Sequence, residues 1–225
     1  MDFTFYGHAC FQINVDATRL LFDPFISGNP LAKDIDINTI EADYILVSHG
    51  HSDHIADLMQ IAQRTNATVI CVAEIADWIT AQGYSNVHPM NFGSRAFDFG
   101  MVHFVPAAHS SSLPDGTYGG NPGGFIVETP SKTFYYTGDT CLTMDMKLVP
   151  SYAKIDVAIM PIGGNFTMNY KQAILASDFI VCDNIVGVHF DTFGYIVIEH
   201  EEVKTAFSAA HKVIRLPEIG QTLAL

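Results

Sequence analysis

One heptapeptide limits the fold of this chain more than any other segment, the sequence Ser-His-Gly-His-Ser-Asp-His at positions 48–54. Its spacing is H-x-H-x-D-H. The apolar run at 44–47 precedes it and predicts a buried strand, and residues 55–62 follow with apolar side chains at helical spacing. Imidazole and carboxylate groups are the ligands that divalent transition metals prefer. The pattern therefore predicts a metal-binding loop between a strand and a helix.

The spacing within this loop indicates two neighbouring ions. His49 and His51 can converge on one ion, whereas Asp53 and His54 begin the helix and point elsewhere. Each ion then needs further ligands from distant parts of the chain, and two adjacent cations need an anion between them. A His-rich polar loop without metal is the alternative, but closely packed imidazoles repel one another when protonated and have little structural use.

Metal-type residues also recur directly after other apolar strands. In four places a predicted strand ends and such a residue stands in the loop that follows it: His49, His109, Asp139 and His189. Sites in sheet-based folds form at strand ends, so the four loops are expected to lie along one edge.

The rest of the chain predicts strands with intervening helices. Residues 110–124 are rich in Ser, Gly, Pro and Asn and are interpreted as a loop. The order allows two similar halves, at about 1–115 and 116–225. Strands are expected near 3–6, 10–15, 19–24, 68–72, 95–99, 101–105, 124–128, 133–136, 157–161, 185–188 and 213–216, and helices near 73–82, 145–151, 171–177 and 199–211.

Composition narrows the class of protein. The chain has 225 residues with 48% apolar content, enough for one core, which predicts a single domain over residues 1–225. The net charge of -13 argues against an extended nucleic-acid surface. No targeting segment begins the chain and no apolar run approaches the ~20 residues of a membrane span, so a cytoplasmic protein without a membrane partner is expected.

The four cysteines are widely spaced and form no C-x-x-C pair. This pattern favours reduced, mostly buried thiols, as in cytosolic proteins. Cys141 lies two residues from Asp139, and is interpreted as a small core residue rather than a residue that lines a site.

The order of these motifs resembles the metallo-β-lactamase superfamily. H-x-H-x-D-H is followed by a single His, by Gly-Asp-Thr at 138–140 and by a late His after a strand. Residues 7–11, 161–168 and 189–193 are similar to a group of small bacterial metal-dependent hydrolases that resembles the ascorbate-6-phosphate lactonases. The resemblance implies an α/β (α+β) fold, a four-layer αββα sandwich with the site between the two sheets at one edge.

The resemblance also implies a ligand set. One ion would be bound by His49, His51 and His109, the second by Asp53, His54 and His189, and Asp139 would bridge them. Zinc is the first candidate for both ions, with manganese or iron as alternatives. Histidine at position 51, where the diiron members of the superfamily usually have Glu, favours hydrolysis over redox chemistry.

A metal-dependent hydrolase is therefore expected. A water shared by two ions can have its pKa lowered from ~15.7 to near ~7, which supplies a nucleophile for an ester, lactone or phosphodiester bond. The resemblance gives Asp53 a catalytic role as well, in which it orients the nucleophile or moves a proton. A non-catalytic metal-binding or scaffold protein of the same fold is the alternative from another class.

Three further residues are candidates for the site. His8 would donate a hydrogen bond to substrate or act as a general acid, with a turn histidine bonded to backbone as the alternative. Asn165 and Thr167 would contact substrate, or would form a structural Asx or ST turn.

The expected partner is a small-molecule substrate. Only Lys147 and Lys171 lie near the candidate loops, so the case for a phosphorylated substrate is modest. The resembling lactonases form oligomers, and a homo-oligomer is therefore expected here.

Overall fold

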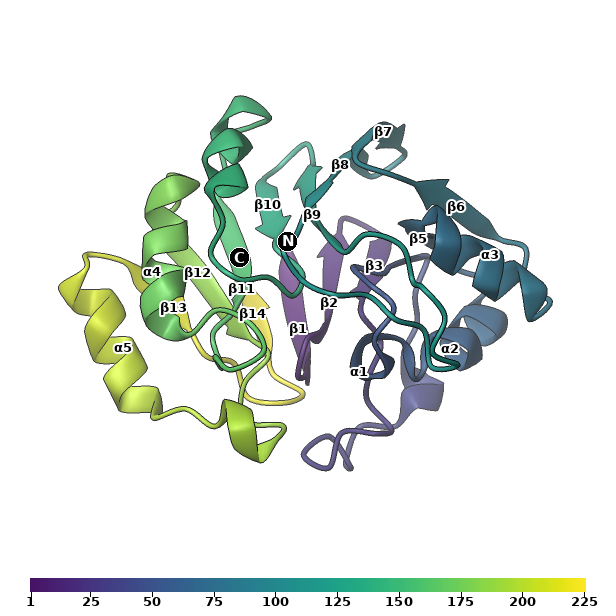
Figure 1. Ribbon diagram of the computed structural model, residues 1–225, viewed down its shortest axis with the longest axis horizontal. Coiled ribbons are helices and arrows are strands. Elements are labelled where there is room, and N and C mark those ends of the chain that lie inside the picture. The colour runs from purple at the N-terminus through teal and green to yellow at the C-terminus, as the bar shows by residue number, and fades with distance from the viewer. The chain divides into compact units, whose positions relative to one another are not determined.

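The computed structural model describes residues 1–225 and divides them into two compact units. Unit 1 comprises Met1–Gly93, Ser110–Pro122 and Glu218–Leu225. Unit 2 comprises Ser94–His109 and Gly123–Pro217. Each unit is built on its own seven-stranded sheet flanked by helices (Figure 1). The expected boundary between two halves near residue 115 is wrong, because the chain leaves unit 1 after Gly93, returns to it for one loop and returns again at its C-terminus.

The sheet of unit 1 has the order β14-β1-β2-β3-β4-β5-β6. Neighbours from β3 to β6 are parallel, whereas β2 runs antiparallel to both β1 and β3. Consequently β1, β3 and β4 all end at the same edge of this sheet. The strands are β1 (Asp2–Gly7), β2 (Cys10–Val15), β3 (Thr18–Phe22), β4 (Tyr44–Leu46), β5 (Thr68–Val72), β6 (Val87–Met90) and β14 (Thr222–Ala224).

The interior strands of this sheet are buried almost completely, which explains their unbroken apolar runs. Three phenylalanine rings stack across neighbouring strands, with centroids 5.0 Å apart for Phe3 and Phe11 and 4.6 Å apart for Phe11 and Phe22. All three rings are fully buried. They hold β1, β2 and β3 in register beneath the loops at the strand ends.

The helices of unit 1 are η1 (Ile37–Thr39), α1 (Ser52–Ile55), α2 (Leu58–Thr65) and α3 (Ala73–Ala81). A single helix from residue 55 was expected, but the structure breaks it between α1 and α2. The carboxylate of Asp57 accepts hydrogen bonds from the backbone N–H of Ile26 (2.5 Å) and Ser27 (2.9 Å), and its own N–H donates to the Pro24 carbonyl. The N–H of Asp57 is thus bonded outside the helix, while its carbonyl accepts the first hydrogen bond of α2 from the Ile61 N–H at 3.0 Å.

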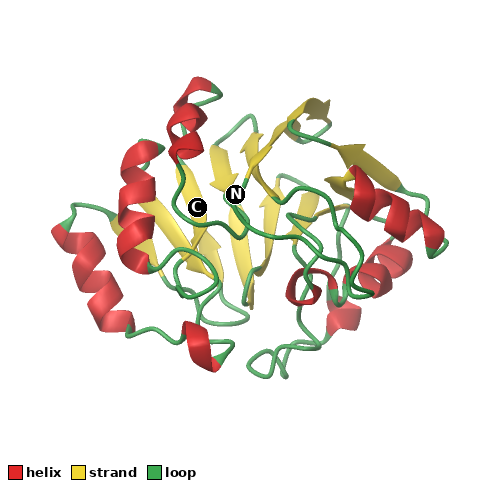
Figure 2. Cartoon of the chain, viewed as in Figure 1, coloured by secondary structure: helices red, strands yellow, loops and turns green.

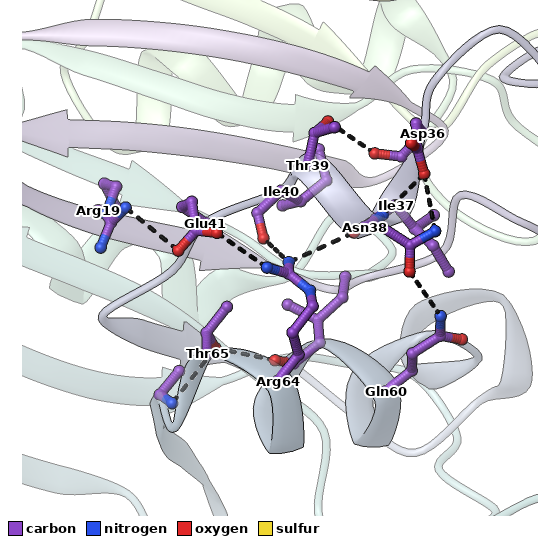
Figure 3. Close-up of polar contacts among 12 residues, drawn as sticks. Arg19, Asp36, Ile37, Asn38, Thr39, Ile40, Glu41, Gln60, Arg64 and Thr65 are labelled. Atoms are coloured by element: carbon purple, nitrogen blue, oxygen red, sulfur yellow. Dashed lines mark hydrogen bonds and ion pairs between the residues drawn. The ribbon is translucent and has the colours of Figure 1, made fainter.

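Polar contacts fasten α2 to the loop that carries η1 (Figure 3). The Arg64 guanidinium donates to the Glu41 carboxylate at 2.8 Å and to the carbonyls of Ile37 and Ile40. Glu41 also lies 3.5 Å from Arg19 of β3. The helix that follows the histidine-rich loop is thereby held against its own sheet.

The sheet of unit 2 has the order β13-β12-β11-β10-β9-β8-β7. The strands from β10 to β13 are parallel, and β9 is antiparallel to both β8 and β10. As in unit 1, three strands that precede metal-type residues, β8, β10 and β12, end at one edge. The strands are β7 (Gly93–Phe97), β8 (Gly100–Pro106), β9 (Gly123–Glu128), β10 (Thr133–Tyr136), β11 (Val157–Pro161), β12 (Asn184–Val188) and β13 (Val213–Arg215).

The helices of unit 2 are η2 (Met144–Ser151), α4 (Tyr170–Phe179), η3 (Gly194–Ile196) and α5 (His200–Ala209). Helix α4 packs on β11 and η2, and α5 packs on β13 and α4 (Figure 2). A capping box starts α4, because the Asn169 side chain accepts from the Gln172 N–H and the Gln172 side chain accepts from the Asn169 N–H. None of the helices in either unit has the length and apolar character that a membrane crossing requires.

All four cysteines are free thiols, as predicted. Cys10, Cys71 and Cys182 are buried, and burial raises the pKa of each thiol above its ordinary value. Cys141 is exposed, so its interpretation as a core residue was wrong. Its backbone N–H bonds the Ala108 carbonyl at 3.2 Å within a loop at the surface.

Candidate metal centre

The candidate site residues of unit 1 lie just after the ends of its strands. His8 follows β1, Asp23 follows β3 and His49 stands three residues beyond β4, all at one edge of the sheet. His8 and Asp23 both have left-handed backbone conformations, with φ of 56° and 42°. Non-glycine residues rarely adopt this conformation, and they do so mostly where the surrounding structure requires a particular side-chain direction.

At this edge, Asp23 contacts both Ser48 and His54. Its carboxylate is fully buried and accepts from the Ser48 N–H at 2.7 Å and the Ser48 hydroxyl at 2.6 Å. It also lies 2.9 Å from Nδ1 of His54. An ionised carboxylate only accepts hydrogen bonds, so Nδ1 of His54 carries the proton and its lone pair lies on Nε2. This is the arrangement that orients histidine ligands in metal sites.

Ser48 extends the same control to His49. The Ser48 hydroxyl donates its proton to Asp23 and therefore accepts from Nδ1 of His49, 3.0 Å away. The lone pair of His49 is thus also on Nε2. One buried carboxylate sets the tautomer of two imidazoles whose ring centroids are 4.2 Å apart.

His51 differs from His49 and His54 in that its Nδ1 faces the neighbouring imidazole. Its Nδ1 lies 2.9 Å from Nε2 of His49, and its Nε2 lies 3.3 Å from the hydroxyl of Ser110. Two neighbouring nitrogens that point at one another in this way suit a shared cation. Gly50 between them is tightly packed, because an added Cβ would lie 3.1 Å from the Leu113 side chain and 3.4 Å from the Ser111 hydroxyl.

His8 and Asp53 form the other half of the unit 1 cluster. Nε2 of His8 lies 3.1 Å from the Asp53 carboxylate, and the ligand atoms of His8, Asp53 and His54 all lie within 4.8 Å of one another. His8 is 1% exposed and packs its ring edge-on against Phe25, at 5.5 Å between centroids. The alternative of a histidine bonded only to turn backbone does not describe this contact.

Unit 2 gathers the other predicted ligands around Asp139. Its carboxylate lies 3.0 Å from Nε2 of His189 and 3.6 Å from Nε2 of His109. The His109 and Asp139 loops are joined, because the Ala108 N–H donates to the Thr140 hydroxyl at 3.0 Å. His189 leaves β12 with φ of 54°, so it too has a left-handed backbone directly after a strand.

Asn165 and Thr167 lie on the loop after β11. Asn165 is exposed and has a left-handed backbone, with φ of 57°. Thr167 is buried, and its hydroxyl donates to the Met168 carbonyl at 3.4 Å. The geometry favours a turn role for Thr167, while contact of either residue with substrate stays a prediction.

The donor set fits divalent metal ions. In unit 1 neutral imidazoles with assigned lone pairs converge beside a carboxylate, and in unit 2 two imidazoles flank one carboxylate. Such nitrogen and oxygen donors suit zinc, manganese or iron. The two thiols near this edge of unit 1, Cys10 and Cys71, are both buried, and burial raises the pKa of each, so neither is a competing nucleophile.

Sequence reasoning missed Asp23 and Ser48. Asp23 precedes a proline, which makes an aspartate at this position look like an ordinary turn residue. The available signal was the one used for the other loops, since Asp23 also follows an apolar strand directly. Applied there, it would have placed a carboxylate at the same edge as His49.

Comparison with known proteins identifies the family. The beta-lactamase superfamily domain matches residues 18–190. A UPF0173 metal-dependent hydrolase of Flavobacterium johnsoniae is 55% identical over the full length of both chains, and one of Methylacidiphilum infernorum is 51% identical, again over both full lengths. The chain belongs to the UPF0173 metal-dependent hydrolases of the beta-lactamase superfamily.

The fold of this hydrolase has a solved counterpart. Igni18, a metallo hydrolase from the archaeon Ignicoccus hospitalis, superposes with a TM-score of 0.89 at 31% identity, covering 99% of this chain and 97% of that one. The metallo-β-lactamase fold and the enzyme class predicted from the sequence are therefore confirmed.

Proposed function

We propose that this hydrolase uses two divalent ions, zinc in the first instance, to cleave an ester, lactone or phosphodiester bond in a small molecule. The observation that carries the proposal is the Asp23 network, which leaves the lone pairs of His49 and His54 on Nε2. A pair of bound ions would supply the nucleophile by lowering the pKa of water from ~15.7 to near ~7.

The proposed ligand assignment follows the family resemblance. His49, His51 and His109 would hold one ion, and Asp53, His54 and His189 would hold the other. Asp139 would supply the anion that two adjacent cations need. Its support within unit 2 is that one carboxylate lies beside both His109 and His189, which belong to different ions in this assignment. In this proposal residues 1–225 act as one hydrolase domain.

His8 is the proposed proton donor. Its Nε2 lies 3.1 Å from the Asp53 carboxylate, so this pair would hold one proton between them until a leaving group takes it. His8 is buried at this contact, whereas the Asp53 side chain is partly exposed. Asp53 in turn orients the nucleophile, and Asn165 and Thr167 remain the proposed contacts to substrate.

The proposal also covers the charge of the substrate and the cellular compartment of the reaction. Both lysines near the candidate loops are engaged by aromatic rings, with Lys147 4.5 Å from the Phe179 centroid and Lys171 5.5 Å from that of Tyr170. This favours an uncharged ester or lactone over a phosphorylated compound. We place the reaction in the cytoplasm, where the four free thiols stay reduced, and propose a homo-oligomeric assembly.

Metal stoichiometry tests the proposal. The purified protein should contain two ions per chain by mass spectrometry, lose turnover of simple lactones and of bis-(p-nitrophenyl) phosphate on chelation, and regain it with zinc or manganese. Asp139→Ala should bind metal poorly, because the two cations then repel without a bridging anion. Asp98→Asn, at an exposed position, is the control.

Two results separate the alternatives. Full activity in metal-free protein would exclude the metal-dependent mechanism. Two tightly bound ions without turnover of any ester, lactone or phosphodiester would favour the non-catalytic metal-binding alternative.

A further inference from the structure

Two exposed aromatic side chains meet on the surface of unit 2. The Phe166 and Tyr195 rings are 6.1 Å apart between centroids and stand at 80°, an edge-to-face pair. Phe166 is 52% exposed and Tyr195 is 78% exposed. We call these two residues the aromatic pair. Exposed apolar side chains that lie side by side can mark a binding surface.

Tight backbone turns hold both members in place. The Gly164 N–H bonds the Met168 carbonyl at 3.0 Å, and the Phe166 N–H bonds the Gly164 carbonyl at 2.7 Å. On the other loop, the Ile196 N–H bonds the Phe193 carbonyl at 3.0 Å, which fixes the turn of η3 that carries Tyr195. The rings are therefore displayed by ordered loops, so little conformational entropy is lost when a ligand binds them.

These two loops leave the same sheet edge as the unit 2 ligands. Phe166 lies on the loop after the parallel strand β11, and Tyr195 lies six residues beyond His189, after β12. The loops pack directly on one another, because a Cβ at Gly163 would collide with the His189 carbonyl and with Ile196. The aromatic pair is thus built from the loops that position His189.

We propose that the aromatic pair binds a flat apolar group of the substrate, and that the substrate class is an ester or lactone carrying an aromatic or comparably flat group. This rests on the proposed hydrolytic function. Rings at right angles present one face and one edge, which suits an aromatic ligand that stacks on one ring and meets the edge of the other. The phenol of Tyr195 additionally offers a polar contact at the rim.

Paired hydroxamates provide the probes. Acetohydroxamic acid and phenylacetohydroxamic acid share one metal-binding group and differ by a phenyl ring. With zinc-loaded protein in a calorimeter, the phenyl compound should bind about tenfold tighter, as expected when one aromatic contact contributes. Phe166→Ala and Tyr195→Ala should each reduce this ratio, and the double variant should bring it close to one. Tyr195→Phe should retain it.

The control removes exposed apolar surface elsewhere in unit 2. Leu175→Ala, at a residue of α4 that is 49% exposed, should keep the wild-type ratio. Zinc content is measured for every variant and should not change. The two single variants decide the result if the double variant does not fold.

Each failure has its own signature. Equal binding of the two hydroxamates by wild-type protein, or a ratio that survives both single substitutions, overturns the aromatic site while leaving the hydrolytic function intact. Absence of binding by both compounds overturns the metal-dependent function, and the aromatic site with it. If Phe166→Ala or Tyr195→Ala changes the sedimentation coefficient while the affinity ratio of the two hydroxamates stays at the wild-type value, the aromatic pair contacts another protein chain instead.

Discussion

Replacing Asp23 by Asn separates the shape of its side chain from its charge. The amide has nearly the same volume, so the buried space stays filled. It retains one acceptor oxygen, which can still accept from the Ser48 N–H. The other end becomes an NH2 group, which then faces the Ser48 hydroxyl and Nδ1 of His54, the atoms that now lie 2.6 and 2.9 Å from the carboxylate.

The expected effect comes from mismatched donors. The Ser48 hydroxyl can rotate, accept from the new amide and donate to Nδ1 of His49, but a protonated Nδ1 of His54 cannot accept. His54, together with His49, should therefore change tautomer and carry its proton on Nε2, where a metal ligand needs a lone pair. Loss of such an orienting partner costs about 10–100-fold in metal affinity, which is about 1.4–2.8 kcal/mol.

Two measurements test this reasoning together. Zinc affinity is obtained by competition with a chromophoric chelator, and nitrogen-15 spectra of the imidazoles report the tautomer in the metal-free protein. Asp34→Asn, at an exposed residue of the same unit, is the matched control. Wild-type zinc affinity in Asp23→Asn, with His54 still protonated on Nδ1, would refute the role assigned to Asp23.

Three other substitutions have defined outcomes. Arg64→Met should lower the free energy of unfolding by about 1–2 kcal/mol in denaturant titrations, since the Ile40 carbonyl and Glu41 lose their donor (Figure 3). Arg19 holds the pKa of the Asp43 carboxyl below its ordinary value through hydrogen bonds. That stabilisation is complete above the unfolded pKa of ~3.9 and is lost as pH falls through the lower folded value. Asp43→Asn should therefore flatten the acid side of the stability curve, by a small amount because both side chains are more than a third exposed. His8→Ala should keep its metal and lose about 100-fold in turnover, and unchanged kinetics would leave His8 a structural residue.

Much of the fold could be predicted from the sequence because strand ends and apolar runs are local signals. The strand at 44–47, the hairpins at 95–105 and 124–136 and the helices near 73–82 and 199–211 are all present within a few residues. The seven proposed ligands were readable for the same reason, since each stands at a short, fixed distance from such a signal. Their gathering within each unit follows from the parallel pairing of the strands that precede them.

The missed features depend on contacts that local pattern does not contain. Residues 87–90 were not recognised as a strand because Pro89 has no N–H to donate to a neighbouring strand. However, β6 is the outermost strand of its sheet, a position where proline is tolerated. The break before α2 is equally invisible, since the apolar period continues through Asp57. Only the tertiary bonds from Ile26 and Ser27 to the Asp57 carboxylate show why the helix breaks at this residue.

Backbone strain at the strand ends bears on whether the site is functional. His8, Asp23 and His189 have φ values of 56°, 42° and 54°, and none of them is glycine. A left-handed non-glycine residue costs of order 1–3 kcal/mol, so glycine would relieve strain at each position. Glycine would also remove a needed side chain at each position. These side chains are the His8 imidazole beside Asp53, the Asp23 carboxylate that sets two tautomers, and the His189 imidazole beside Asp139. Six other non-glycine residues of the chain also have positive φ, so what points to a binding site is that the side chains of these three meet ligand-type groups.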